Sequence, residues 1–130
     1  MGIKFFASIA LAINAALVLA APALAEGNAK KGKATFDTHC GTCHWETKAG
    51  GNLVGPNLSS VLGRKAGSFE GFHYSAAMKA KSHIWTEPNL LRFLAAPDKM
   101  VPDTEMGFGG FADANMARDV IAYLKSVQGK

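Results

Sequence analysis

The spacing of hydrophobic residues predicts a long helix near each end of the main part of the chain. Small and aromatic side chains recur every three or four positions over 28–39, which is the period of one helical face. Larger apolar side chains recur with the same period over 113–127. The residues at these positions are Ala29, Gly32, Lys33 and Phe36 in the first helix, and Met116, Val120, Tyr123, Leu124 and Val127 in the second.

The segment between these helices is rich in turn-forming residues. Glycine and proline punctuate 41–65, so we expect mostly turns there, followed by a short helix over 75–81. Thr86 is a suitable N-cap for a helix over 87–95, which Pro97 ends. No run alternates polar and apolar residues as a half-buried strand does, so the predicted fold class is all-α.

A predicted loop over 100–112 is long for so small a domain. It contains Pro102 and three glycines, which favour a loop over a helix. It also contains Met106, Phe108 and Phe111, and such apolar residues argue against disorder. Because long ordered loops in compact domains are usually functional, we expect this one to serve a site.

Residues 1–25 have the pattern of a secretory signal peptide. A lysine near the start precedes an apolar run, and a small-x-small cleavage site ends at Ala25. The run approaches the length of a membrane-spanning helix, so an uncleaved anchor is the alternative, but Pro22 and the cleavage site favour removal. We expect cleavage after Ala25, a mature domain over 26–130, and a periplasmic location.

Composition narrows the classes of function. The 130 residues include 14 Lys and Arg and 10 Asp and Glu. These charges are interspersed rather than clustered, which does not fit a nucleic-acid-binding face. Only two cysteines occur, too few for the disulfide framework of an exported protein. No repeat or linker divides the mature chain, so we expect a single domain and a monomer.

The two cysteines lie in a Cys-x-x-Cys-His pattern formed by Cys40, Cys43 and His44. This pattern is the attachment motif of a c-type haem. Each thiol adds to one haem vinyl group, and the imidazole that follows is then held under the iron as an axial ligand. The sequence therefore predicts one covalently bound haem c.

Two other uses of the cysteine pair are less consistent with the sequence. A thioredoxin-type redox motif would follow a strand in a βαβ pattern, which is not predicted here. A zinc site needs four ligands and usually a second pair of cysteines or histidines. The other histidines form no such pair and are interpreted as surface residues; they are His39, His73 and His83.

The second axial ligand decides between an electron carrier and a reactive haem. Iron with both axial positions filled exchanges electrons, whereas an open position binds oxygen, peroxide or carbon monoxide. The candidate thioethers belong to Met78, Met100, Met106 and Met116. We interpret Met78 and Met116 as packing residues. Met106 is favoured, because it lies among turn-forming residues far from His44 in sequence, while Met100 in the same segment is its rival.

On these residues, the chain resembles class I cytochrome c, close to the mitochondrial type and its secreted bacterial relatives. The resemblance covers nearly all of 26–130 without gaps. The matching residues are Gly32, Phe36, Cys40–His44, Gly55-Pro56-Asn57-Leu58, Gly63-Arg64-Lys65, Tyr74, Trp85, Leu94, Pro97, Pro102, Thr104, Met106, Phe108 and Asp119–Lys125. The resemblance implies a compact single domain with haem in its core, whose terminal helices cross where Phe36 meets Tyr123 and Gly32 allows close approach.

The resemblance also implies roles for several residues in haem binding. Met106 would be the sixth iron ligand, and the Pro56 carbonyl would accept the spare N–H of His44. Four side chains would hydrogen-bond the haem propionates, which otherwise bring negative charge into a poorly solvated place. These four are Arg64, Tyr74, Trp85 and Thr104.

The chain departs from this family at two places. The usual tyrosine and asparagine near the ligand sulfur are Phe93 and Met78 here, which thins the hydrogen bonding and is expected to shift the reduction potential. Lysines that surround the haem edge in the mitochondrial type are largely replaced, so the family's acidic partners do not carry over directly. The residues at those positions are His39, Leu53, Asp98, Glu105, Ala112 and Asp113.

The sequence thus predicts a soluble one-electron carrier, not an enzyme. Its expected partners are larger redox proteins outside the cytoplasmic membrane, such as a quinol-oxidising cytochrome complex, a terminal oxidase, or a periplasmic dehydrogenase or reductase. Two alternatives remain open. One is a haem enzyme or gas-binding protein, if Met106 does not bind the iron; the other is a fixed electron-transfer subunit of a larger complex.

Overall fold

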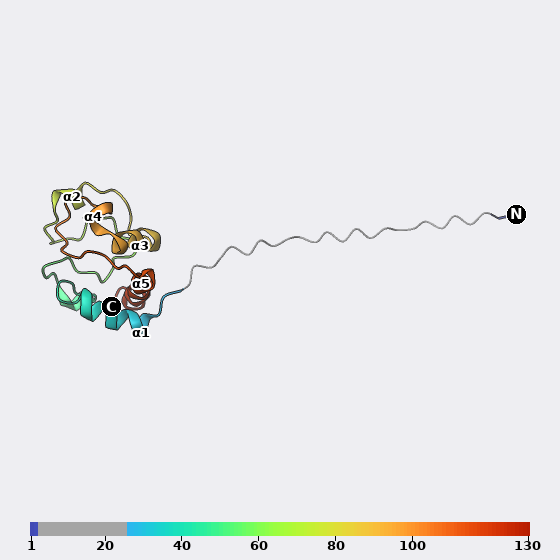
Figure 1. The fold of residues 1–130 in the computed structure, drawn as a ribbon, viewed down its shortest axis with the longest axis horizontal. Coiled ribbons are helices and arrows are strands. Elements are labelled where there is room, and N and C mark those ends of the chain that lie inside the picture. Colours follow the sequence, from blue (N-terminus) through green and yellow to red (C-terminus); the bar gives the residue numbers. More distant parts are fainter. Residues whose placement is uncertain (3–25) are drawn as a thin grey trace.

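The computed structural model describes residues 1–2 and 26–130, so nearly all of the predicted signal peptide lies outside the described residues. The described elements are α1 (Ala29–His39), a 3-10 turn η1 (Lys48–Gly50), α2 (Ala76–Lys79), α3 (Glu87–Ala95), α4 (Pro97–Met100) and α5 (Ala114–Val127) (Figure 1). Within the described ranges, extended backbone pairs only in an isolated bridge between Lys65 and Ile84. The predicted all-α class is confirmed. None of the described helices is long and apolar enough to cross a membrane.

The three longer helices begin where their capping residues predict. The N-cap side chains are Asn28, Thr86 and Asp113, and each accepts a hydrogen bond from a backbone N–H two or three residues further on. Such a side chain satisfies one of the N–H groups that lack a partner in the first helical turn. The predicted helices over 28–39, 87–95 and 113–127 are therefore confirmed to within one residue at each end.

Two predicted features of the middle segment are present but have different bounds. The helix predicted over 75–81 is the single turn α2. The loop predicted over 100–112 begins one residue later, because Pro97 starts the short helix α4. Proline suits a first helical turn, where its missing N–H would have had no partner and its fixed φ is already helical. Pro97 therefore ends one helix and begins the next, and Met100 lies in a helix.

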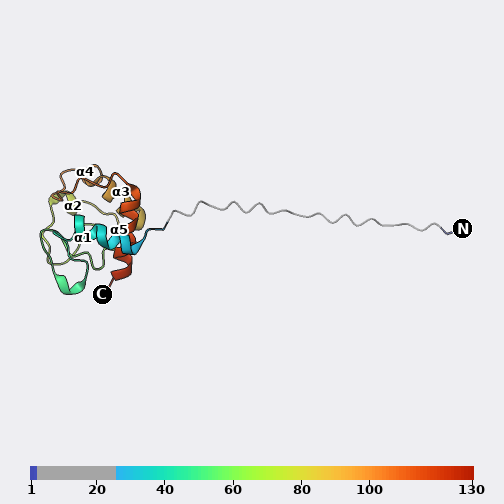
Figure 2. The ribbon, with the colours of Figure 1, turned by 60° about the horizontal axis from the view of Figure 1, so that its bottom comes forward.

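The helices α1 and α5 cross at very close range, as Figure 2 shows. A Cβ atom on Gly32 would stand 1.8 Å from Asp119 O and 2.9 Å from Tyr123 Cβ. The rings of Phe36 and Tyr123 lie 5.6 Å apart beside this contact. Asn28 N donates a hydrogen bond to Asp119 Oδ1 at 2.6 Å. The crossing of the terminal helices that the resemblance implied is present.

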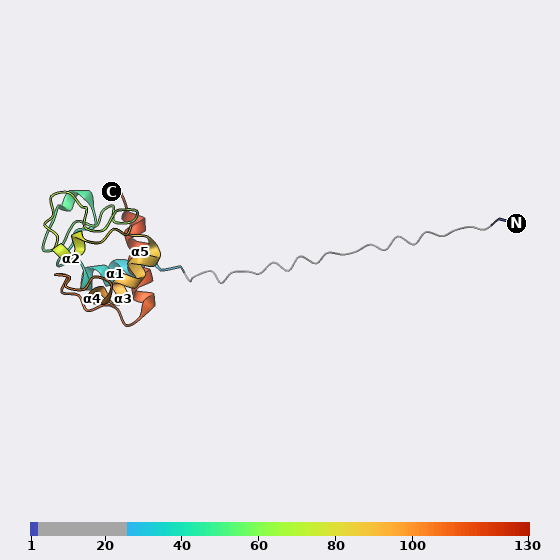
Figure 3. The same cartoon turned by 90° about the horizontal axis from the view of Figure 1, so that it is seen from above.

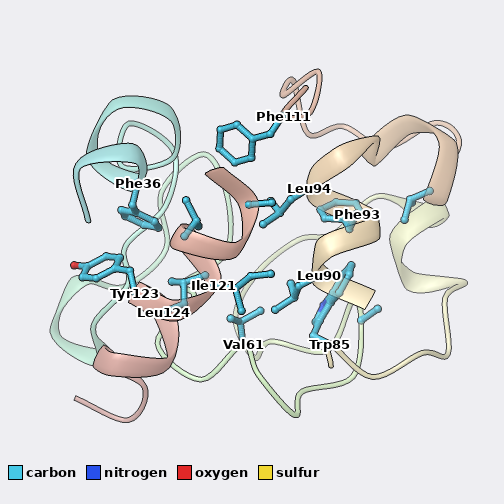
Figure 4. Packing of buried hydrophobic residues seen from close by; sticks show 14 residues of the cluster. Phe36, Val61, Trp85, Leu90, Phe93, Leu94, Phe111, Ile121, Tyr123 and Leu124 are labelled. Atoms are coloured by element: carbon cyan, nitrogen blue, oxygen red, sulfur yellow. The ribbon is translucent and has the colours of Figure 1, made fainter. Parts of the chain in front are cut away.

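One hydrophobic cluster joins α1, α3 and α5 (Figure 4). Phe36 and Tyr123 lie at one end of it, and Trp85 and Phe93 lie at the other. The turn-rich segment (green) and the α3–α4 segment (yellow to orange) lie on opposite sides of α1 in Figure 3. The cluster is therefore bounded by helices on some sides and by turns on others. The predicted haem-attachment motif, 40–44, lies in one of these turns.

The buried faces of the terminal helices differ in detail from the predicted ones. On α5, Ala117 and Ile121 are buried, whereas Met116 and Val127 are only partly buried. On α1, Lys33 points to solvent and pairs with Asp37 at 2.7 Å. Spacing alone does not distinguish two adjacent stripes of one helix, because the crossing angle decides which stripe meets the neighbour.

Candidate functional site

The predicted attachment motif forms a tight turn at the end of α1. The backbone N–H groups of Cys40 and Gly41 both donate to Phe36 O, at 2.7 and 2.9 Å. Those of Cys43 and His44 then both donate to Cys40 O, each at 2.9 Å. Because these bonds wind 40–44 into one turn, the two thiols and the imidazole come from one small region, which is fixed to the backbone carbonyl of the buried residue Phe36.

The ring of His44 is buried and is oriented by Pro56. Its Nδ1 lies 2.7 Å from Pro56 O, and since a carbonyl oxygen can only accept, Nδ1 carries the proton and Nε2 keeps a free lone pair. Gly55 lies against the ring, where a Cβ atom would stand 2.2 Å from His44 Cε1. Burial lowers the pKa of His44, the hydrogen bond to Pro56 partly offsets this, and Arg64 lowers the pKa further. The neutral ring is the form that binds a metal.

The segment that contacts His44 is held in place by Asn57. Asn57 Nδ2 donates to Thr47 O at 2.8 Å and to Gly51 O at 3.0 Å, and Oδ1 accepts from Ser59 N at 2.8 Å. Asn57 is 1% exposed, so these bonds replace the water that its amide loses. The sequence matched Asn57 to a family motif without a role, and only the structure shows that it joins three parts of this loop.

Arg64 presents two buried nitrogen donors that have no partner among the described residues. Its Nη2 donates to Asn57 O at 3.0 Å, whereas Nε and Nη1 are buried without an acceptor there. The guanidinium lies 4.6 Å from the centre of the Phe69 ring. Unpaired buried donors on a cation are costly, so this arrangement fits an anionic group bound beside Arg64. The propionates of a haem are groups of this kind.

Tyr74 and Trp85 lie close to Arg64. Tyr74 Oη accepts a hydrogen bond from Phe69 N at 3.2 Å, which leaves its own O–H available to donate. Burial raises the pKa of Tyr74, although Phe69 N and Arg64 act in the opposite direction, so the hydroxyl stays protonated at neutral pH. Trp85 N donates to Arg64 O at 2.8 Å, and the side chain of Trp85 is buried. The structure thus brings these three expected propionate donors together.

Met106 and Thr104 lie on a separate segment of the chain. Thr104 Oγ1 accepts a hydrogen bond from Met106 N at 3.3 Å, and Thr104 N donates to Val101 O at 3.1 Å. Within 26–130, no hydrogen bond joins either residue to His44 or Arg64. Burial does not single out one methionine, because four are partly buried against the core: Met78, Met100, Met106 and Met116.

The side chain of Cys40 is partly buried against the hydrophobic cluster. Burial, followed by the neighbouring Cys43, raises the pKa of Cys40 to about 11, so the thiol is protonated at neutral pH. A thioether has no ionisable group and therefore suits this place better than a thiolate ligand to zinc. Among the residues that the structure describes, no three histidine, cysteine or acidic side chains gather as a zinc site requires.

The interpretation of the three remaining histidines as surface residues holds fully for two of them and only in part for the third. His39 and His73 are exposed. His83 is only partly exposed, its ring meets Trp85 edge-on at 4.5 Å, and its Nε2 is buried without a partner. Phe93 lies on the other side of this region, 4.9 Å from Trp85. The one signal in the sequence was that His83 lies two positions before Trp85, a residue expected to bind a haem propionate.

Comparison with known proteins gives consistent matches. The family model described as cytochrome c matches residues 29–128. A cytochrome c of Gibberella zeae is 45% identical over 102 residues, which are 78% of this chain and 96% of that protein. A cytochrome c of Stellaria longipes is 43% identical over 100 residues, 77% and 93% of the two chains. A cytochrome c homolog of Bradyrhizobium diazoefficiens is 47% identical over 89 residues, 68% of this chain and 48% of that protein.

Proposed function

The chain belongs to the cytochrome c family, and we propose that Cys40 and Cys43 hold its haem c while His44 and Met106 bind the iron. The resemblance to class I cytochrome c of the mitochondrial type is confirmed. Members of this family bind haem c covalently and transfer electrons rather than turn over a substrate. When bound, the haem supplies an iron that gains and loses one electron.

The observation that carries this proposal is the fixed orientation of His44. Its protonated Nδ1 is held by Pro56 O at 2.7 Å, so the ring offers the lone pair of Nε2 to a metal. His44 directly follows the turn that contains both cysteines, so one short segment provides the covalent anchors and an axial ligand. The unpartnered N–H groups of Arg64 supply the matching donors for the propionates.

We assign the second axial position to Met106. A thioether is a soft, neutral donor that favours ferrous iron and leaves no position for an external ligand. The hydrogen bond from Met106 N to Thr104 Oγ1 shapes the backbone that presents this side chain. Met100 is the rival in the same segment, but it lies at the end of the short helix α4 and not in the glycine-containing loop that carries Met106.

Matched substitutions of the two methionines test this assignment. The Met106→Ala variant should lose the weak far-red sulfur-to-iron absorption band, have a lower reduction potential, and bind carbon monoxide in its ferrous form. The Met100→Ala variant should retain the band, the potential and the resistance to carbon monoxide. If the two variants exchange behaviours, the ligand is Met100. Rapid carbon monoxide binding by the unmodified protein would instead support a haem enzyme or gas-binding protein.

Covalent attachment has a test of its own. Extraction with acid and an organic solvent should leave the colour on the polypeptide, because thioethers at Cys40 and Cys43 survive this treatment. Haem that moves into the organic phase would contradict the attachment. The doubly substituted Cys40→Ser, Cys43→Ser protein should not accumulate in folded form, since a bound cofactor contributes folding free energy to a small core.

We further propose that the carrier works outside the cytoplasmic membrane after cleavage following Ala25. The small-x-small pattern at that residue supports this, and the family match starts only at residue 29. The protein isolated from its host should begin at Glu26. An earlier first residue would support an anchored carrier, and co-purification with large redox subunits would support a fixed subunit.

The partners that we propose are larger redox proteins: a quinol-oxidising cytochrome complex, a terminal oxidase, or a periplasmic dehydrogenase or reductase. The residues expected around the haem edge include few lysines, so apolar contact should carry more of the encounter than charge. Leu53 is 43% exposed and Val54 is 80% exposed on the loop next to Gly55, which supports an apolar contribution on the His44 side.

A further inference from the structure

His83 combines features that the proposed function does not use. Its side chain is partly exposed, yet Nε2 is buried and has no hydrogen-bond partner within 26–130. The imidazole meets the ring of Trp85 at 85° with the ring centres 4.5 Å apart. Buried polar atoms without partners are rare in native structures and point to a role beyond packing.

The backbone fixes His83 beside the region expected to bind the propionates. Ala66 N donates to His83 O at 2.9 Å, and Trp85 N donates to Arg64 O at 2.8 Å. The residues between them, Lys65 and Ile84, form the antiparallel bridge. His83 and Trp85 are therefore held along the same short stretch of backbone as Arg64, whose Nε and Nη1 are buried without acceptors.

We propose that His83 takes up a proton when the haem is reduced and releases it when the haem is oxidised. This inference rests on the proposed haem site. Reduction adds one negative charge to the site, delivered by an external one-electron donor. A positive imidazolium at His83 is then more favourable, so its unprotonated ring nitrogen takes a proton from solvent, and oxidation releases that proton.

The surroundings of His83 suit such a coupling. The ring of Trp85, which is 6% exposed, covers one side of the imidazole, and Phe93 packs behind it against Trp85, so water screens the charge of His83 less on that side. The charged groups that bear on His83 are Lys81 on its own segment and Arg92 on α3, and both are cationic. Burial first, and then these two cations, lower the pKa of His83 below its ordinary value of 6.5.

The sign of the expected effect follows from this direction. Oxidised haem adds positive charge, which lowers the pKa of His83 further, and reduced haem raises it again. The reduction potential should therefore be higher in acid, where His83 is charged in both oxidation states, and should fall as the pH rises through the two pKa values. By linkage, each tenfold difference in proton affinity between the two states equals 59 mV of potential between the acid and alkaline limits.

The experiment is a spectroelectrochemical titration of the haem-loaded protein between about pH 4.5 and pH 8. The unmodified protein should show a step in potential that is absent from His83→Gln, a polar but non-titrating variant. His73→Gln, which removes an exposed histidine, is the matched control and should retain the step. In proton NMR spectra of the unmodified protein, the His83 ring protons should titrate at a lower pH in the ferric form, by the amount that the step requires.

Several outcomes would overturn this inference. One is a flat potential in the unmodified protein, and another is a step that survives in His83→Gln. A step removed equally by His73→Gln, or identical NMR midpoints in the two oxidation states, would also reject it. The NMR comparison needs no variant, so misfolding of His83→Gln does not remove the test. Failure of the proposed function is distinct, because it would appear as missing covalent haem or as carbon monoxide binding by the unmodified protein.

Discussion

Replacing Gly32 with alanine tests how closely the two terminal helices approach. The new Cβ would lie 1.8 Å from Asp119 O and 2.4 Å from Asp119 C, whereas ordinary contact begins at 3.4 Å. Both neighbouring atoms belong to the backbone of α5, so no side-chain rotation relieves the overlap. The helices must separate by about 1.6 Å at this point, which is the difference between 3.4 Å and 1.8 Å.

The cost of this separation can be worked from the side chains beside Gly32. Phe36 is 1% exposed and Tyr123 is 7% exposed. Burial of such a side chain contributes about 1.5–3 kcal/mol, and a gap of about 1 Å loses up to half of its packing contacts. If each of the two rings loses half, they lose about 1.5–3 kcal/mol together, while alanine returns about 1 kcal/mol as the better helix former. The net loss of unfolding free energy should be about 0.5–2 kcal/mol.

Urea unfolding of the haem-loaded protein measures this loss. With a slope of about 2 kcal/mol per molar urea for a small protein, the midpoint of Gly32→Ala should fall by about 0.3–1 M with the slope unchanged. Gly109→Ala is the control, because its new Cβ would meet nothing within 4 Å, and its midpoint should hardly move. A Gly32→Ala midpoint equal to or above that of the unmodified protein would refute the close crossing.

Three further substitutions probe the site and its surface. Gly55→Ala would place a Cβ 2.2 Å from His44 Cε1, so the ring must tilt; the Soret spectrum and potential should change, and unchanged values would contradict the contact. Burial, and then Glu46, raise the pKa of Tyr123 above 10.0. The neutral tyrosine therefore stabilises the fold below about pH 10, and this stabilisation is lost as the pH rises further. Above that pH, the urea midpoint of Tyr123→Phe should fall less steeply than that of the unmodified protein. Electron transfer to a strongly acidic partner should depend weakly on salt, whereas Leu53→Lys should make the rate fall as salt is added; a steep fall in the unmodified protein would reject apolar docking.

Local chemistry made the helices of this chain predictable. Asn28, Thr86 and Asp113 each cap a helix through their own side chain, so the start of the helix depends on residues only two or three positions away. Pro97 was harder to interpret, because proline both stops one helix and suits the first turn of another. Which of the two stripes of α5 is buried depends on the crossing with α1, and no local pattern contains that information.

In the candidate site, too, local features were predictable and features set by tertiary packing were not. The turn over 40–44 is local, so its chemistry could be read from five consecutive residues. The contacts of Asn57 join positions up to ten residues apart in a loop without regular periodicity. The buried, unpartnered nitrogens of Arg64 and His83 depend on the packing of distant segments. Polarity suggested a surface position for His83, and tertiary packing against Trp85 overrode it.

The two sides of the proposed iron site are secured unequally. On the His44 side, the buried amide of Asn57 holds the loop through three hydrogen bonds. On the Met106 side, the described bonds within 101–106 are a turn at Thr104 N and the 3.3 Å contact to its hydroxyl. Segments with few buried bonds open more often than the rest of a native protein. Brief openings of this loop should therefore free Met106 while His44 stays bound to the iron. Cyanide or imidazole should then bind the iron on the methionine side, at a rate limited by how often the loop opens and not by global unfolding.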